Sequence, residues 1–83
     1  MNPQKIVELE IRVVSSEVLV HDARHGMIHV LNTTAGRVLE LCDGTRDAAT
    51  IAAVLAAETG GEPVGVGVDV NAILEQFAML GIV

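Results

Sequence analysis

The sequence has almost no aromatic residues: Phe77 is the only one among 83 residues, with no tryptophan and no tyrosine. Proteins that bind single-stranded nucleic acid stack the bases on aromatic side chains, and duplex binding needs a basic surface. Lysine and arginine together number only 5, against 11 aspartates and glutamates, so the formal net charge is −6. The cations do not cluster along the chain. The composition therefore argues against nucleic acid as a partner.

Long apolar runs and paired cysteines are also missing. The longest purely apolar run, residues 51–57, is far shorter than a membrane span. Cys42 is the only cysteine, so no disulfide can form within the chain. The first residues, MNPQKIVELEIR, lack the charged and then apolar pattern of a signal peptide. We therefore expect a cytoplasmic protein with no membrane association.

Aliphatic residues are what the sequence does contain. Hydrophobic residues make up 51% of the chain, which is more than a disordered segment carries. The length indicates a single domain, residues 1–83, in which we expect residues 1–5 to be disordered. Folding at this size buries only about 60–65% of the surface of the unfolded chain, so stability will be modest.

Alternation of apolar and polar residues predicts strands in the first half of the chain. Residues 6–14, IVELEIRVV, alternate with period two, which is typical of a half-buried strand. Two further short strands, residues 17–20 and 27–31, flank a segment with the turn formers Asp22 and Gly26. An antiparallel hairpin is the simplest arrangement for this pair.

Helical spacing of apolar residues begins after Asn32, which we expect to cap the first helix. Gly44 is expected to end that helix in a left-handed conformation. Thr45 is expected to begin the second helix, with Asp47 in its first turn, and that helix should end near residues 59–61. The apolar residues with helical spacing are Ala35, Val38, Leu39 and Cys42 in the first helix, and Ala48, Ile51, Val54 and Leu55 in the second.

The third helix has two candidate starts, Pro63 and Asp69. Gly65 and Gly67 would each cost about 1 kcal/mol inside a helix relative to alanine, whereas Asp69 is an alternative cap. Gly81 is expected to end the helix. Three strands followed by three helices predict a winged-helix-like α+β domain with a three-stranded antiparallel sheet. The apolar arc of the third helix contains Val70, Ile73, Leu74, Phe77 and Leu80.

Three histidines, His21, His25 and His29, are spaced by four residues. On a helix this spacing would suggest a metal site, but here the histidines straddle a hairpin, and we expect them to be solvated. The serines lie in no Gly-x-Ser-x-Gly elbow, and Cys42 lies at the position of a small core residue. We therefore expect no enzyme activity, no metal and no cofactor.

Binding through a strand edge is the function that remains. An outer strand exposes unpaired amides and carbonyls, and residues 27–31 contain no Pro, Lys or Arg that would block pairing. An extended peptide can add there as a further strand, with the third helix as one wall of a groove. The alternative is that the whole apolar arc of that helix is core, and periodicity alone does not decide between the two. The expected contacts are Met27, Ile28, His29, Val30, Leu31, Ile73, Gln76 and Leu80.

Three segments, VHDARHGMIHVLNTTAGRVLELCDG, TIAAVLAAE and DVNAILEQFAMLGIV, together resemble the PqqD-like family, the precursor-peptide recognition elements of ribosomal peptide natural-product pathways. The resemblance covers residues 17–83. The matching positions are Leu31 and Asn32, the small residue Ala35, Asp43 and Gly44, Ile51 and Leu55, Asp69 and Val70, and finally Gly81, Ile82 and Val83.

The resemblance implies a winged-helix-like fold and a non-catalytic role. Such proteins bind the leader segment of a precursor peptide as an added strand and present the core peptide to a separate modifying enzyme. That enzyme is a radical SAM protein or a leader peptidase and cyclase pair. The third strand departs from the family, which often has aromatic residues where this chain has Met27, Ile28 and His29. By the resemblance, the peptide edge is residues 27–31 and the helical wall is Ile73, Gln76, Phe77 and Leu80.

Two other functions use the same fold. A second copy of the chain can pair with the same edge and give a homodimer or a swapped hairpin. A winged-helix DNA-binding regulator is the other alternative, and the acidic balance argues against it. If the partner is a leader peptide, the net charge of −6 favours a leader with basic residues.

Overall fold

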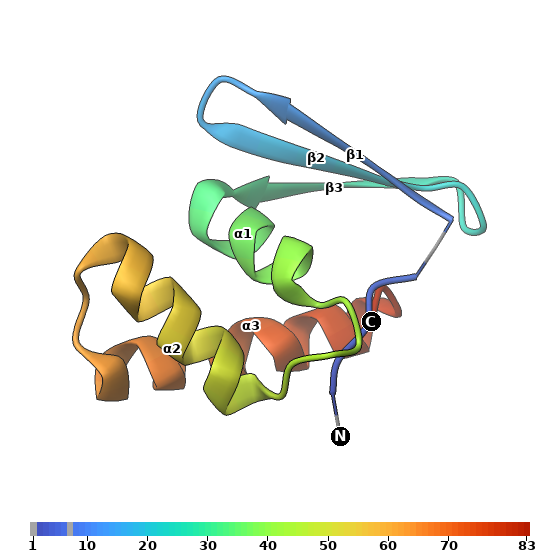
Figure 1. Cartoon of the computed structure of the whole chain (residues 1–83). Helices are drawn as coiled ribbons and strands as arrows, with labels where there is room; N and C mark the ends of the chain where they lie inside the picture. Colours follow the sequence, from blue (N-terminus) through green and yellow to red (C-terminus); the bar gives the residue numbers. More distant parts are fainter. Residues whose placement is uncertain (1, 7) are drawn as a thin grey trace.

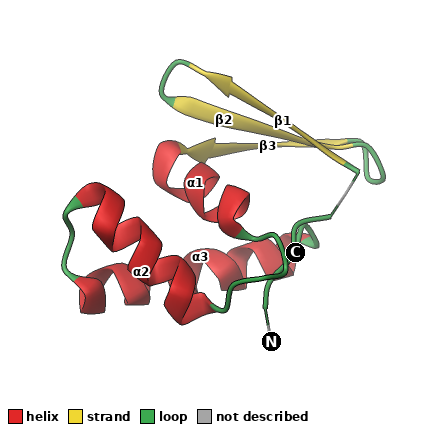
Figure 2. Cartoon of the chain, viewed as in Figure 1, coloured by secondary structure: helices red, strands yellow, loops and turns green. Residues whose placement is uncertain are grey.

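Three strands precede three helices in the structure, a computed structural model that describes residues 2–6 and 8–83 and, of Pro63, the backbone alone. The sheet lies on one side, and α1 lies between it and the pair formed by α2 and α3 (Figures 1 and 2). The predicted α+β fold is confirmed. The elements are β1 (Leu9–Val14), β2 (Glu17–Asp22), β3 (Met27–Asn32), α1 (Thr33–Leu41), α2 (Ala48–Thr59) and α3 (Pro63–Leu80).

The sheet is antiparallel, with β2 in the centre and with β1 and β3 at its edges. The first strand was expected to begin at Ile6, but β1 begins at Leu9. The Ile6 amide instead donates to the carbonyl of Ile82 at 3.0 Å, which holds the chain against the C-terminus. The alternation also included Val7, which lies outside the described residues.

The described part of the N-terminal segment, which we expected to be disordered up to Lys5, lies along the end of α1. The Lys5 amide donates to the carbonyl of Cys42 at 2.7 Å, and the Gly44 amide donates to the carbonyl of Pro3 at 3.1 Å. Gln4 also forms an isolated antiparallel bridge with Asp43. These backbone hydrogen bonds place residues 3–5 beside the loop that follows α1.

Helix α1 begins as the sequence predicted and ends differently. The Asn32 side chain accepts from the Ala35 amide at 2.8 Å, so Asn32 is the N-cap. The expected cap at Gly44 is wrong, because α1 ends at Leu41 and Cys42 is its C-cap. Gly44 does have a positive φ of 85°, but it lies in the loop beyond the helix.

Helix α2 begins later than expected. Thr45 does not start it, because the Thr45 amide and hydroxyl both donate to the Asp43 carboxylate, at 2.9 and 2.6 Å. Asp47 is the N-cap rather than a first-turn residue, and its side chain accepts from the Thr50 amide at 2.8 Å. The predicted end is confirmed, with Gly60 in a left-handed conformation as the C-cap.

Helix α3 begins at Pro63, the earlier of the two candidate starts. Glu62 is its N-cap position and Pro63 provides a preformed first turn, so Gly65 and Gly67 lie inside the helix. Asp69 is therefore an interior residue and not a cap. Gly81 ends the helix, as predicted, and is its C-cap in a left-handed conformation. In the described part of the chain, no helix is long and apolar enough to cross a membrane.

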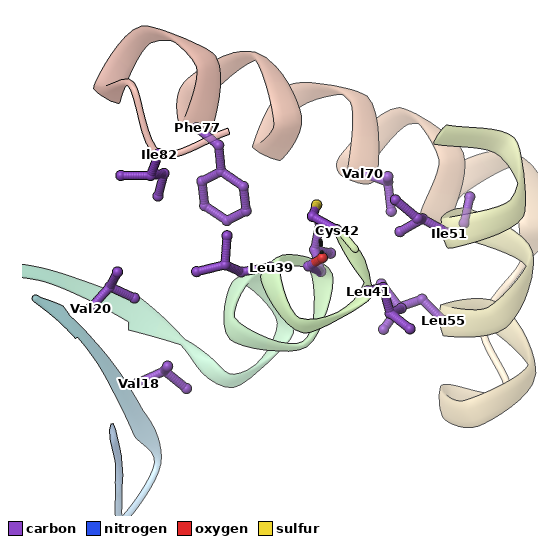
Figure 3. Close-up of a cluster of buried hydrophobic side chains, with 12 residues drawn as sticks. Val18, Val20, Leu39, Leu41, Cys42, Ile51, Leu55, Val70, Phe77 and Ile82 are labelled. Carbon is purple, nitrogen blue, oxygen red and sulfur yellow. Dashed lines mark hydrogen bonds between the residues drawn. The ribbon is translucent and has the colours of Figure 1, made fainter. Parts of the chain in front are cut away.

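The core draws on the sheet and on all three helices (Figure 3). Cys42 is fully buried and its Sγ donates to the carbonyl of Val38 at 3.1 Å, as expected of a core residue. Burial raises the pKa of the Cys42 thiol to about 11, so it stays protonated at neutral pH. The buried hydrophobic residues include Val18, Val20, Val38, Leu39, Ile51, Leu55, Val70, Phe77 and Ile82.

Candidate functional site

The outer edge of β3 is not paired with any strand that the structure describes. β2 covers one side of β3 along its whole length, from the Glu17–Asn32 pair to the Asp22–Met27 pair. On the other side, every Cα of β3 lies more than 8 Å from every Cα of α3. The edge expected to bind a peptide is therefore unpaired among the described residues, and no Cα of the described C-terminal helix comes within 8 Å of it.

The turn between β1 and β2 determines which groups of β3 face this edge. Only Ser15 and Ser16 separate Val14 from Glu17, and Ser15 has a φ of 57°, as in the tight turns of two-residue hairpins. Such a turn points the Glu17 amide at the Val14 carbonyl, towards β1. Peptide groups alternate in direction along a strand, so those of Val18 point towards β3.

The same alternation continues into β3. Val18 pairs with Leu31 and Val20 pairs with His29, so the main-chain groups of Leu31 and His29 are directed at β2. The amides and carbonyls of Ile28 and Val30 are then the ones directed at the open edge. These two residues offer the hydrogen bonds that an added strand would complete.

The side chains of β3 divide between the two faces of the sheet. Met27, His29 and Leu31 pair with residues that face the helices, and they lie on that inner face. Ile28 and Val30 lie on the outer face, where they are 65% and 58% exposed. The sequence predicted these five residues as one contact set. In the structure only Met27, His29 and Leu31 lie on the face of the sheet towards the helices.

The helical wall predicted from the sequence is also divided. Ile73 is half-buried, Gln76 is exposed and Leu80 is 39% exposed, so all three have surface to offer. Phe77 is only 1% exposed and lies in the core near Leu39 (Figure 3). Phe77 is therefore a core residue, and its ring offers almost no surface to a ligand.

An open hollow of about 400 Å³ lies where β3 passes into α1, beside the middle of α3. Its lining includes Thr34, Asp69 and Ala72, which the sequence analysis did not predict as contacts. The α3 residues of the lining, Asp69, Ala72, Ile73 and Gln76, have the spacing of one helix face. Once α3 is known to start at Pro63, this spacing predicts that Asp69 and Ala72 lie on the same face as Ile73 and Gln76. The hollow is lined by Asn32, Thr34, Ala35, Asp69, Ala72, Ile73 and Gln76.

The family model of coenzyme PQQ synthesis protein D (PqqD) matches residues 17–83. The chain belongs to the PqqD family. The match runs from the start of β2 to the C-terminus, and it therefore includes both β3 and the α3 wall. No curated protein sequence matches the chain significantly.

Two solved structures share the fold of this PqqD-family chain. One is TbiB1 in complex with the TbiA(beta) leader peptide, with 16% identity and a TM-score of 0.80 over 95% of this chain and 92% of that chain. The other is a lasso peptide synthetase B1 complexed with the leader peptide, with 20% identity and a TM-score of 0.81 over 99% of this chain and 96% of that chain.

In this PqqD-family protein, a buried carboxylate ties the β2–β3 hairpin to the end of α3. Asp22 is fully buried and accepts hydrogen bonds from the Arg24 amide at 3.1 Å and from its guanidinium at 3.3 Å. His25 Nδ1 lies 2.8 Å from the same carboxylate. Arg24 Nη2 also donates to the carbonyl of Gly81 at 2.9 Å, which joins the hairpin to α3 at the Met27 end of β3.

The hydrogen bonds from Arg24, followed by those from His25, hold the pKa of Asp22 well below its ordinary value. A carboxyl whose pKa is lowered by folding stabilises the fold above its unfolded pKa of about 4, and this contribution is lost as the pH falls further. We expect the melting temperature of Asp22→Asn to fall less steeply below pH 4 than that of the wild type. Thermal unfolding between pH 2 and 7 measures this, and parallel curves would contradict it.

The three histidines do not converge. His21 pairs with Ile28 on the outer face and its Nδ1 lies 3.9 Å from Glu10, whereas His29 lies on the inner face. His25 is in the turn beside Asp22. Across the described ranges, no three His, Cys, Asp or Glu side chains are placed to hold a metal ion.

Proposed function

We propose that this PqqD-family chain binds the leader segment of a ribosomally synthesised precursor peptide by β-strand addition to β3. The observations that carry the proposal are the unpaired edge of β3 and, at its end, the hollow of about 400 Å³ between Asn32 and α3, and we propose a groove that leads from one to the other. Hydrogen bonds to Ile28 and Val30 would provide affinity, and alternate leader side chains would enter the groove. We propose that those side chains contact Met27, His29, Leu31, Ile73, Gln76 and Leu80.

The family and the two structural neighbours support this proposal. Both neighbours are complexes with leader peptides, and both cover more than nine-tenths of this chain. The groove offers main-chain pairing, apolar contact and polar groups, which suit recognition of an extended peptide. We propose that the chain is not itself an enzyme and presents the core peptide to a separate one, a radical SAM protein or a leader peptidase and cyclase pair.

Titration with candidate leaders tests the proposal. The probes are labelled synthetic peptides that match the N-terminal halves of short reading frames encoded beside the gene for this chain. We expect one of them to bind and to shift backbone amide resonances of β3 and α3 in NMR spectra, because the peptide adds between these elements. Shifts confined to β1 or α2 would contradict the proposal.

Dimerisation through β3 is a second candidate, because Ile28 and Val30 make this edge apolar and exposed. Light scattering over a dilution series, with and without the leader, separates the two functions. We expect a monomer that binds one leader peptide. A dimer that persists on dilution and excludes the leader would show that the edge serves self-association instead.

A further inference from the structure

Asp69 is an exposed residue in the interior of α3 and does not cap the helix. Aspartate is less favourable than alanine inside a helix, and the N-cap position of α3 is Glu62 rather than Asp69. The ion pairs found in the described part of the chain do not include it. The exposed carboxylate therefore sits at the surface of α3 with no ion-pair partner among the residues that the structure describes.

The surroundings of Asp69 suit a long cationic side chain. Ala35, Ala72 and Ile73 provide apolar surface in the same hollow of about 400 Å³. Lysine and arginine lay their methylene stems along apolar surface and keep the charged head at a polar group. A stem packed on these three residues would bring the head to Asp69.

An anion is the less suitable occupant, although the hollow also adjoins the N-terminus of α1. A helix N-terminus carries about half a positive charge, against the full negative charge of Asp69. Asn32 already satisfies one first-turn amide of α1, that of Ala35, at 2.8 Å. The net charge of −6 adds to the preference for a cation.

The hollow lies on the path of an added strand. Side chains of such a strand that pair beside Met27, His29 and Leu31 point to the inner face, where α3 lies. The next inward position, past Leu31, lies beside Thr33, just beyond the end of β3, where Asn32 lines the hollow. An extended leader that continues past β3 would thus bring one side chain to the hollow that Asp69 lines.

We propose that the leader carries lysine or arginine at this inward position, with its charged head paired to Asp69 and its stem on Ala35, Ala72 and Ile73. The inference rests on the proposed function and adds the chemistry of one leader position. Loss of the Asp69 charge should weaken binding of such a peptide about fivefold, near the upper end for an exposed ion pair. The loss should shrink at high salt, because salt screens exposed charges.

A displayed library of random 12-residue peptides, selected on the wild type and on variants, tests the inference. Wild-type selections should enrich Lys or Arg at one position of the peptides, and selections on Asp69→Lys should enrich Asp or Glu there. Glu75→Lys is the matched control, because it makes the same charge change at another exposed position of α3, outside the hollow. Selections on Glu75→Lys should match those on the wild type.

A third variant, Val30→Pro, separates failure of the inference from failure of the proposed function. Peptides that bind the wild type but not Val30→Pro are bound at the β3 edge. The pairing with Asp69 is wrong, and edge binding stands, in either of two cases. In the first, such peptides have no enriched Lys or Arg position; in the second, selections on Asp69→Lys still enrich Lys or Arg at that position. If no peptide sensitive to Val30→Pro is selected, edge binding fails and the inference fails with it. Thermal unfolding should show that Asp69→Lys and Glu75→Lys melt within a few degrees of each other.

Discussion

Replacing Val30 with proline is expected to weaken leader binding about 100-fold while the domain stays folded. The amide of Val30 faces the open edge of β3, so proline removes a donor that no residue of the sheet uses. The bound leader would be left with an unpaired carbonyl, and the proline ring would occupy the space where that carbonyl lies. Fluorescence anisotropy with a labelled leader measures the loss.

Two variants control for other effects of this change. Val30→Ala keeps the amide and removes a side chain on the outer face, so we expect its affinity to fall much less than that of Val30→Pro. His29→Pro removes an amide directed at β2, and we expect it to destabilise the sheet. Equal leader affinity for the wild type and for Val30→Pro would show that strand addition does not occur at this edge.

The features that the sequence predicted well depend on neighbouring residues. The Asn32 cap, the helix ends near Gly60 and at Gly81 and the two short strands of the hairpin follow from local propensities, and the structure confirms them. Asp47 shows the limit of this approach. The sequence predicted Asp47 as a first-turn residue, but the bonds from Thr45 to Asp43 keep Thr45 outside the helix, and Asp47 is the cap.

Tertiary contacts determine what the sequence left open at the candidate site. The division of β3 into edge-facing and β2-facing residues depends on the register with β2, which periodicity does not give. Phe77 had the same apolar spacing as Leu80, yet Phe77 is buried and Leu80 is 39% exposed, because the core covers only part of the arc. The sequence predicted Asp22 only as a turn former. Its role in holding Arg24, which donates to the carbonyl of Gly81, depends on contacts between residues far apart in the sequence.

Replacing Gly36 with alanine is expected to destabilise the domain by about 2 kcal/mol, although alanine is the better helix former by about 1 kcal/mol. Gly36 lies in α1 directly against β2, and an added Cβ would lie 2.9 Å from the Cβ of Val18. The core fixes the positions of both α1 and β2, so one of these two elements must move to make room for the added methyl group. We expect thermal unfolding to show a melting temperature lower by about 8–16 °C.

The same substitution at Gly65 should have the opposite effect. Gly65 also lies within a helix, but an added Cβ there would meet nothing within 4 Å, so alanine should stabilise α3 by about 0.5–1 kcal/mol. If both variants are more stable than the wild type, α1 does not lie against β2 as described. Because α1 follows β3 without a linker, a displaced α1 would also move the open edge relative to α3. Gly36→Ala should therefore lower leader affinity as well as stability, whereas Gly65→Ala should leave leader affinity unchanged.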